Sequence, residues 1–258
     1  MTLLSVEDVC FSRICFSLQI CRKMLRNSIV LLKNSIASHR LVSIRQRFAE
    51  KGVCSYMYDI PVSLLLGYLI GCINPAWIIS RYKKIELRRE GTKNLGATNA
   101  FLTIGKVVGV LVLFLDISKA YIAVILAKAL FPQFALAGIL AGSTVMLGHM
   151  FPFNLGFKGG KGSACLAGVV IALDYQLFLV LLLIGFAIAF LVNYHWALPV
   201  SAAVMFPFTY GLTTQSSLNC SILLIPCLCL ILKHSENYRR VREGTEPTIR
   251  RYQKKSHL

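Results

Sequence analysis

A short run of glycines and lysines in this chain has the residue types that bind phosphate. Residues 156–162 read Gly-Phe-Lys-Gly-Gly-Lys-Gly and directly precede an apolar run that begins at Ser163. Glycines let several backbone N–H groups converge on an anion, and a helix starting at Ser163 would add the partial positive charge of its N-terminus. Lys161 can add a full charge. The spacing is not that of a Walker loop, so the run predicts either a phosphate site or, more commonly, a plain glycine-rich turn.

A second polar segment, residues 91–99, places hydrogen-bonding side chains around two glycines. Asn94, Thr98 and Asn99 can donate or accept hydrogen bonds, and Thr92 can cap a following turn. Taken alone, this composition favours a turn or a helix cap over a binding site.

A third polar segment begins at His234, after the last apolar run. On a helix, His234 and Asn237 would share one face, and Glu236 would pair with Arg240 on another. Gly244 would end that helix. A neutral histidine at a membrane surface can act as a general base. More commonly, such a histidine is only an amphipathic residue at the membrane interface.

Two charged residues interrupt an otherwise apolar run. Asp116 and Lys119 lie three residues apart inside it, and a charge within a membrane is costly unless it is paired. We therefore predict a structural ion pair between them. We expect His149, at the end of the next apolar run, to hold the adjoining loop in place. No set of acids, histidines or cysteines has ligand spacing, so we expect no metal and no cofactor.

The elements that must position these residues are membrane helices. The chain has 258 residues, is 56% hydrophobic and only 15% charged, and has a mean hydropathy of +0.64. Its charges cluster between apolar runs, as in membrane proteins. The net charge of +17 would suit nucleic-acid binding, but the basic residues lie beside the apolar runs, where they orient a protein in a bilayer. We therefore expect an all-α, polytopic membrane bundle that binds no nucleic acid.

Seven apolar segments can be counted as helices of this bundle. They are residues 60–80, 107–127, 134–152, 163–173, 176–192, 196–212 and 218–232. The weak breaks at 174–175 and 213–217 can be read through, which leaves five longer spans instead.

The distribution of basic residues favours an odd number of spans. They gather in loops 81–106 and 153–162 and in the tail after Leu232, whereas the connections 131–133, 174–175 and 213–217 carry none. With seven or five spans, all basic loops fall on one face, which the positive-inside tendency makes cytoplasmic. We predict seven spans in the inner membrane, with the C-terminus and the active site facing the cytoplasm.

Residues 1–56 fit this topology poorly, because they carry a basic excess and yet would lie outside. Their acid-poor composition, with arginines and serines, resembles an organelle presequence. We expect Met57 to be the true start, with residues 1–56 either an upstream overrun or a cleaved targeting segment. The membrane domain would then be residues 57–247, followed by a basic cytoplasmic tail at 248–258.

Six motifs occur together and in order between about Pro61 and Pro247, and the ordered set is far more specific than any one of them. They are Gly67-Tyr68-Leu69-Ile70-Gly71, residues 91–99, Leu115-Asp116-x-x-Lys119, Gly148-His149-Met150-Phe151-Pro152, residues 156–162, and His234-x-x-Asn237-x-x-Arg240 with Gly244-Thr245-Glu246. The chain resembles the bacterial acyl-phosphate:glycerol-3-phosphate acyltransferases.

The resemblance implies a membrane enzyme of phospholipid synthesis. It would transfer an acyl chain from acyl phosphate to the 1-hydroxyl of glycerol 3-phosphate, giving lysophosphatidic acid and phosphate. Because acyl phosphate is already activated, the site has only to orient the hydroxyl, stabilise the carbonyl oxygen and accept a proton. The expected catalytic residues are His234 as the base, Asn237 as a positioning donor, and Lys161; a substrate phosphate is the alternative base. The expected substrate-binding residues are Thr92, Asn94, Gly96, Thr98, Asn99, Gly159, Gly160, Gly162, Arg240 and Glu246.

Several positions depart from the pattern usual in that family. Cys72 stands in place of a serine, Thr92-Lys93 in place of serine-glycine, and Leu102 in place of a frequent arginine. A divergent membrane acyltransferase with another donor or acceptor therefore stays an alternative. A transporter of phosphorylated solutes is a second alternative, although the sequence shows no clear internal repeat. The sequence predicts no oligomeric state.

Overall fold

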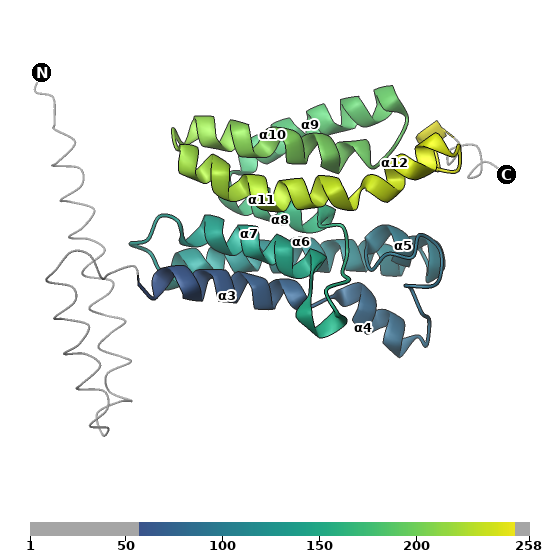
Figure 1. Ribbon diagram of the computed structural model, residues 1–258, viewed down its shortest axis with the longest axis horizontal. Coiled ribbons are helices and arrows are strands. Elements are labelled where there is room, and N and C mark those ends of the chain that lie inside the picture. Colours follow the sequence, from purple (N-terminus) through teal and green to yellow (C-terminus); the bar gives the residue numbers. More distant parts are fainter. Residues whose placement is uncertain (1–56, 251–258) are drawn as a thin grey trace, which may run out of the picture. The chain divides into compact units, whose positions relative to one another are not determined.

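The computed structural model describes residues 57–250, and this part of the chain contains helices and no strand. The predictions for residues 1–56 and for most of the tail lie outside the described residues. Figure 1 shows the helices of the described part. They are α3 (Asp59–Cys72), α4 (Pro75–Tyr82), α5 (Ala97–Thr103), α6 (Lys106–Leu130), α7 (Ala137–Met150), the 3₁₀ turn η1 (Phe153–Leu155), α8 (Ser163–Leu173), α9 (Tyr175–Val192), α10 (Ala197–Thr213), α11 (Ser217–Lys233) and α12 (Ser235–Arg242).

The expected apolar segments all form helices. Within the described residues, four stretches are long and apolar enough to cross a membrane, namely 59–82, 106–130, 175–192 and 217–242, while α8 and α10 are shorter apolar helices. Large aliphatic side chains remain exposed on these helices, for example Leu183 at 71% and Leu191 at 83%. Such a surface suits lipid rather than water.

The first apolar segment is one stretch in the sequence but two helices in the structure. Asn74 breaks it: its side-chain oxygen accepts a hydrogen bond from Trp77 N at 2.8 Å, and its amide donates to Leu95 O at 3.2 Å. Pro75 then occupies the first turn of α4. This is an N-cap followed by proline, a combination that starts a new helix. The break also leaves carbonyl groups at the end of α3 without helical partners.

Small residues let α3 and α7 pack closely. A side-chain carbon at Gly67 would collide with Ala141 O, and one at Gly148 would collide with Tyr68 O. Close backbone approach at small residues is the usual way in which helices associate within a membrane. Around this pair, the core continues through buried residues of α6, α8, α10 and α11, among which Phe206 is one of the largest fully buried side chains.

The polar segments singled out in the sequence meet at one end of this bundle. In Figure 1, α4, α5 and α12 lie toward the same end of the described helices. One cavity there is lined by residues from the segment before α5, the loop before α8, the α9–α10 connection and α12 with the residues after it, and also by Asp116 of α6 and His149 of α7.

Candidate active site

The cavity at this end of the bundle has a volume of about 240 Å³, and it is lined by residues of α5, α6, α7, α8, α10 and α12 and of the segments between them. Of the residues expected from the sequence, those that line it are Thr92, Asn94, Gly96, Thr98, Lys161, Gly162, His234, Asn237, Arg240 and Glu246. The three expected catalytic side chains and most of the expected binding residues therefore lie around one space.

Four of the lining side chains form a continuous polar chain. Lys161 donates a hydrogen bond to Asn237 Oδ1, which turns the amide nitrogen of Asn237 toward Glu246 Oε1, at 2.7 Å. Arg240 Nε donates to the other carboxylate oxygen of Glu246 at 2.6 Å. Each polar group therefore fixes the next, and the chain ends in the ammonium of Lys161.

The predicted pairing of Glu236 with Arg240 is wrong in this structure, because Arg240 pairs with Glu246 instead. The reason is a reversal of the chain after α12. Gly244 has a φ of +68°, a conformation that favours glycine, and the backbone N–H groups of Thr245 and Glu246 then both donate to Arg240 O. The predicted end of the helix at Gly244 is confirmed.

Partial burial changes the acidity of Lys161. Its burial, together with the nearby charge of Arg240, lowers the pKa of Lys161 to about 8. Burial penalises the charged form of a lysine, so an anion that enters the cavity would restore the charge and gain from it. Lys161 is thus suited to binding phosphate near neutral pH.

His234 lies at the junction of α11 and α12 and is 5% exposed. Its Nδ1 lies 2.8 Å from Leu230 O. A carbonyl oxygen only accepts, so Nδ1 carries the proton, and in the neutral ring Nε2 keeps a free lone pair. Since His234 lines the cavity, this tautomer is the one that a general base requires.

The glycine loop does not present all the free backbone N–H groups that were expected to converge on an anion. The N–H groups of Gly159 and Gly160 donate to the carbonyls of Met150 and His149, both at 3.1 Å, so they are not free to bind an anion. A Cβ at Gly160 would collide with the His149 ring and approach Leu95 O, which explains why the loop needs glycine there. Gly162, with a φ of +87°, lines the cavity and leads into α8. The groups that remain for an anion are Lys161 and the start of α8.

Asn99 supports the first polar segment and does not line the cavity. It is fully buried, its amide nitrogen donates to Leu87 O at 2.8 Å and Asn94 O at 3.0 Å, and its oxygen accepts from Thr92 N at 2.7 Å. Asn99 thereby gives residues 87–94 their shape and presents Thr92 and Asn94 to the cavity.

Several residues at or beside the cavity were not anticipated as members of the site, and Asp116 and His149 are among those that line it. His195 and Trp196 line the cavity from the α9–α10 connection, and Arg88 Nη2 donates to Leu155 O at 2.7 Å and to Lys158 O at 2.8 Å, which ties the first polar segment to the glycine loop. The only local signal was the position of His195 between aromatic residues. Leu102, where the family often has arginine, also lines the cavity.

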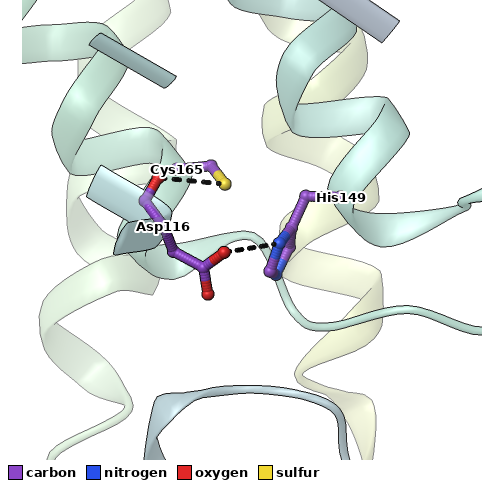
Figure 2. A group of neighbouring side chains, drawn as sticks. All are labelled: Asp116, His149 and Cys165. Atoms are coloured by element: carbon purple, nitrogen blue, oxygen red, sulfur yellow. Dashed lines mark hydrogen bonds and ion pairs between the residues drawn. The ribbon is translucent and has the colours of Figure 1, made fainter. Parts of the chain in front are cut away.

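The predicted ion pair of Asp116 and Lys119 is confirmed, and it extends to His149. Lys119 Nζ lies 2.8 Å from Asp116 Oδ1 and 3.0 Å from His149 Nδ1. Figure 2 shows the Asp116 carboxylate directed toward His149.

The same cluster has the residue types of a metal site, since ligand atoms of Asp116, His149 and Cys165 all lie within 4.8 Å of one another. However, the ammonium of Lys119 already stands where a cation would bind, against Asp116 and His149. The thiol of Cys165 turns instead toward the backbone oxygen of Asp116, at 3.6 Å (Figure 2). These residues fit an internal ion pair better than a metal.

Comparison with known sequences decides the family. The family model for glycerol-3-phosphate acyltransferase matches residues 61–244. The chain belongs to the glycerol-3-phosphate acyltransferase family. This confirms the resemblance drawn from the six motifs. A glycerol-3-phosphate acyltransferase of Staphylococcus haemolyticus is 35% identical over 199 residues, which cover 74% of this chain and 98% of that relative. One from Mesorhizobium japonicum is 34% identical and covers 74% of this chain and 97% of that relative.

Solved structures of the family agree with the fold of this acyltransferase. The crystal structure of PlsY, an integral membrane glycerol 3-phosphate acyltransferase, in its glycerol 3-phosphate form is 30% identical, with a TM-score of 0.67 over 74% of this chain and 95% of that chain. The lysophosphatidic acid form of PlsY is 29% identical, with a TM-score of 0.64 over 73% and 94%. The expectation of a multi-pass helical membrane protein is thereby confirmed.

Proposed function

We propose that this protein transfers an acyl group from acyl phosphate to the 1-hydroxyl of glycerol 3-phosphate, forming lysophosphatidic acid and phosphate. The observation that carries the proposal is the polar chain from Lys161 to Arg240 beside the free Nε2 of His234, all around one cavity. The names of the relatives and the two forms of PlsY support glycerol 3-phosphate as acceptor.

The reaction needs one new bond and one broken bond. The acceptor hydroxyl oxygen attacks the acyl carbonyl carbon, the bond between that carbon and the phosphate oxygen breaks, and phosphate leaves. The hydroxyl proton goes to His234 Nε2, which the Leu230 contact leaves unprotonated in the neutral ring. A substrate phosphate is the alternative acceptor of that proton.

Lys161 binds a substrate phosphate, and Asn237 fixes the position of its ammonium. Arg240 supplies a second positive charge, oriented by Glu246. Preorganised donors of this kind stabilise charge that develops in the transition state. Because acyl phosphate is already activated, no covalent intermediate on the enzyme is needed.

The proposal includes seven crossings of the inner membrane with the C-terminus and the cavity on the cytoplasmic side. The loop that carries Lys161 and the segment after α11 are both rich in basic residues, and such loops tend to remain cytoplasmic. Glycerol 3-phosphate would then enter from the cytoplasm, and the acyl donor would enter from the inner leaflet.

Phosphate release from acyl phosphate by the purified full-length protein tests the function. We expect release that requires glycerol 3-phosphate and that stops when Lys161 is changed to Met. Acyl-CoA in place of acyl phosphate tests the divergent acyltransferase, and uptake of glycerol 3-phosphate into proteoliposomes tests the transporter. Turnover with acyl-CoA only, or uptake without acyl transfer, would contradict the proposal.

A further inference from the structure

The ring of His149 lies on the wall of the cavity, and the acyl transfer described above gives it no role. His149 is 3% exposed and ends α7, and it contributes to the lining together with Lys161. The polar contacts of its ring, to Lys119 Nζ at 3.0 Å and Asp116 Oδ1 at 3.3 Å, both use Nδ1. Nε2 is on the opposite side of the ring and faces Gly160, where a Cβ would collide with it.

The contacts of Nδ1 determine what Nε2 carries. An ammonium group only donates, so beside Lys119 the Nδ1 atom accepts, and the neutral ring must carry its proton on Nε2. In a protonated ring, Nδ1–H donates to Asp116 and Nε2 carries a proton as well. In either state, Nε2 presents an N–H donor beside the residue that precedes Lys161.

The orientation of this donor is held by the rest of the cluster. Lys119 Nζ also donates to Ile73 O at 2.6 Å and to Gly71 O at 3.3 Å. These are carbonyls at the break between α3 and α4, which have no helical partner. The ammonium is therefore anchored on three sides, and it fixes the edge of the ring that carries Nδ1.

We propose that His149 binds a phosphate oxygen of a substrate through its Nε2–H, next to Lys161, and that Lys119 and Asp116 are positioning residues for its ring. The inference rests on the proposed function, because that function places substrate phosphates in this cavity. A hydrogen bond to a charged phosphate is stronger than a neutral one, and its loss weakens binding about tenfold or more.

Two substitutions of His149 separate the roles of its nitrogens. In His149→Asn the amide reaches only the place of Nδ1, whereas in His149→Gln an amide N–H reaches the place of Nε2. We expect His149→Asn to raise the KM for one phosphate substrate about tenfold or more with a smaller change in kcat, and we expect His149→Gln to restore most of that KM. Separate KM values for acyl phosphate and glycerol 3-phosphate identify which phosphate is bound.

Cys165→Ala is the matched control, because Cys165 contacts the same cluster through the Asp116 backbone and does not line the cavity. We expect it to leave both KM values unchanged. Unchanged KM values in His149→Asn, or an equal rise in His149→Asn and His149→Gln, would overturn the proposal.

A measurement on the wild-type protein tests the proposal even if the His149 variants do not fold. The protein is labelled with ¹⁵N-histidine, and its NMR signals are assigned by changing the other four histidines singly. The Nε2–H signal of His149 should shift on saturation with inorganic phosphate. No shift would overturn the proposal. If wild type shows this shift but no acyl transfer, the proposed function fails while the anion site at His149 stands.

Discussion

The ammonium of Lys161 donates to the amide oxygen of Asn237, which joins the glycine loop before α8 to the helix that follows α11. The amide nitrogen of Asn237 is held in turn by Glu246. Because an ammonium can only donate and a carboxylate can only accept, these two groups leave Asn237 a single orientation. Lys161, the proposed phosphate ligand, is thus positioned by residues about 80 positions further along the chain.

Glu246→Gln tests this arrangement. The carboxylate accepts from both Asn237 and Arg240, and a glutamine can accept on only one of its two polar atoms. We expect a loss of about 1.5–3 kcal/mol in the free energy of unfolding and a KM for phosphate substrates raised several-fold. Glu243→Gln is the control, since Glu243 is exposed and pairs only with Arg239 at 3.7 Å. Equal effects of the two changes would contradict the role of Glu246.

The pKa of Lys161, about 8, predicts how substrate binding depends on pH. Below pH 8 the ammonium is charged and attracts phosphate; as pH rises through 8 the charge is lost. Phosphate monoesters have a second pKa of about 6, so they do not change charge in that range. Between pH 7 and pH 9 we therefore expect an increase in the KM for the substrate whose phosphate Lys161 is proposed to bind.

Lys161→Arg provides the comparison for this pH profile. Arginine stays charged throughout the range, so its KM, although altered in size by the different geometry, should be flat where that of the wild type rises. Parallel KM profiles for wild type and Lys161→Arg would show that another group causes the pH dependence.

We expect Arg88→Ala to loosen the glycine loop, although Arg88 itself does not line the cavity. Arg88 donates to Leu155 O and Lys158 O, on either side of the turn at Gly156. Loss of these bonds should lower the melting temperature by a few degrees and raise the KM for phosphate substrates. The neighbouring Arg89→Ala is the control, because Arg89 forms only an exposed pair with Glu86, and such pairs contribute about 0–1 kcal/mol. A stable Arg88→Ala protein with unchanged KM would refute this positioning role.

His234→Ala distinguishes the two proposed proton acceptors. If His234 Nε2 takes the proton, kcat should fall about 10²- to 10⁴-fold, with a smaller change in KM. If a substrate phosphate takes it, kcat should fall little and KM should rise. Steady-state kinetics with acyl phosphate saturating and glycerol 3-phosphate varied gives both numbers, and our account expects the fall in kcat.

Helices were the part of this fold that the sequence could predict. α8 begins and ends where its apolar run does, and the bounds of α9, α10 and α11 lie within one residue of the expected ones. Long apolar runs in a membrane protein have few alternatives, because backbone groups in lipid must bond within the helix. The break at Asn74 was missed although Asn-Pro is a start signal, because the surrounding residues are apolar on both sides.

The sequence predicted which residues form the site better than it predicted how they are arranged. Lys161, His234 and Asn237 stood out by residue type and spacing, and the family resemblance implied their catalytic roles. The structure brings the three side chains together around one cavity. The partner of Arg240 was not predicted correctly, because the pairing with Glu246 depends on a chain reversal at Gly244, and helical spacing alone does not predict that reversal. Asn99 was expected to bind substrate, but its burial among backbone carbonyls depends on a three-dimensional fold of residues 87–94.

Formation of lysophosphatidic acid from radiolabelled glycerol 3-phosphate, by purified wild-type and Lys161→Met proteins in liposomes, tests the central claim most directly. Our account predicts product with the wild type only when acyl phosphate is present, and at least a hundredfold less with Lys161→Met at equal amounts of folded protein, about 2.7 kcal/mol of transition-state stabilisation. A wild-type rate in Lys161→Met, or no labelled product from the wild type while a related acyltransferase is active in the same liposomes, would contradict it.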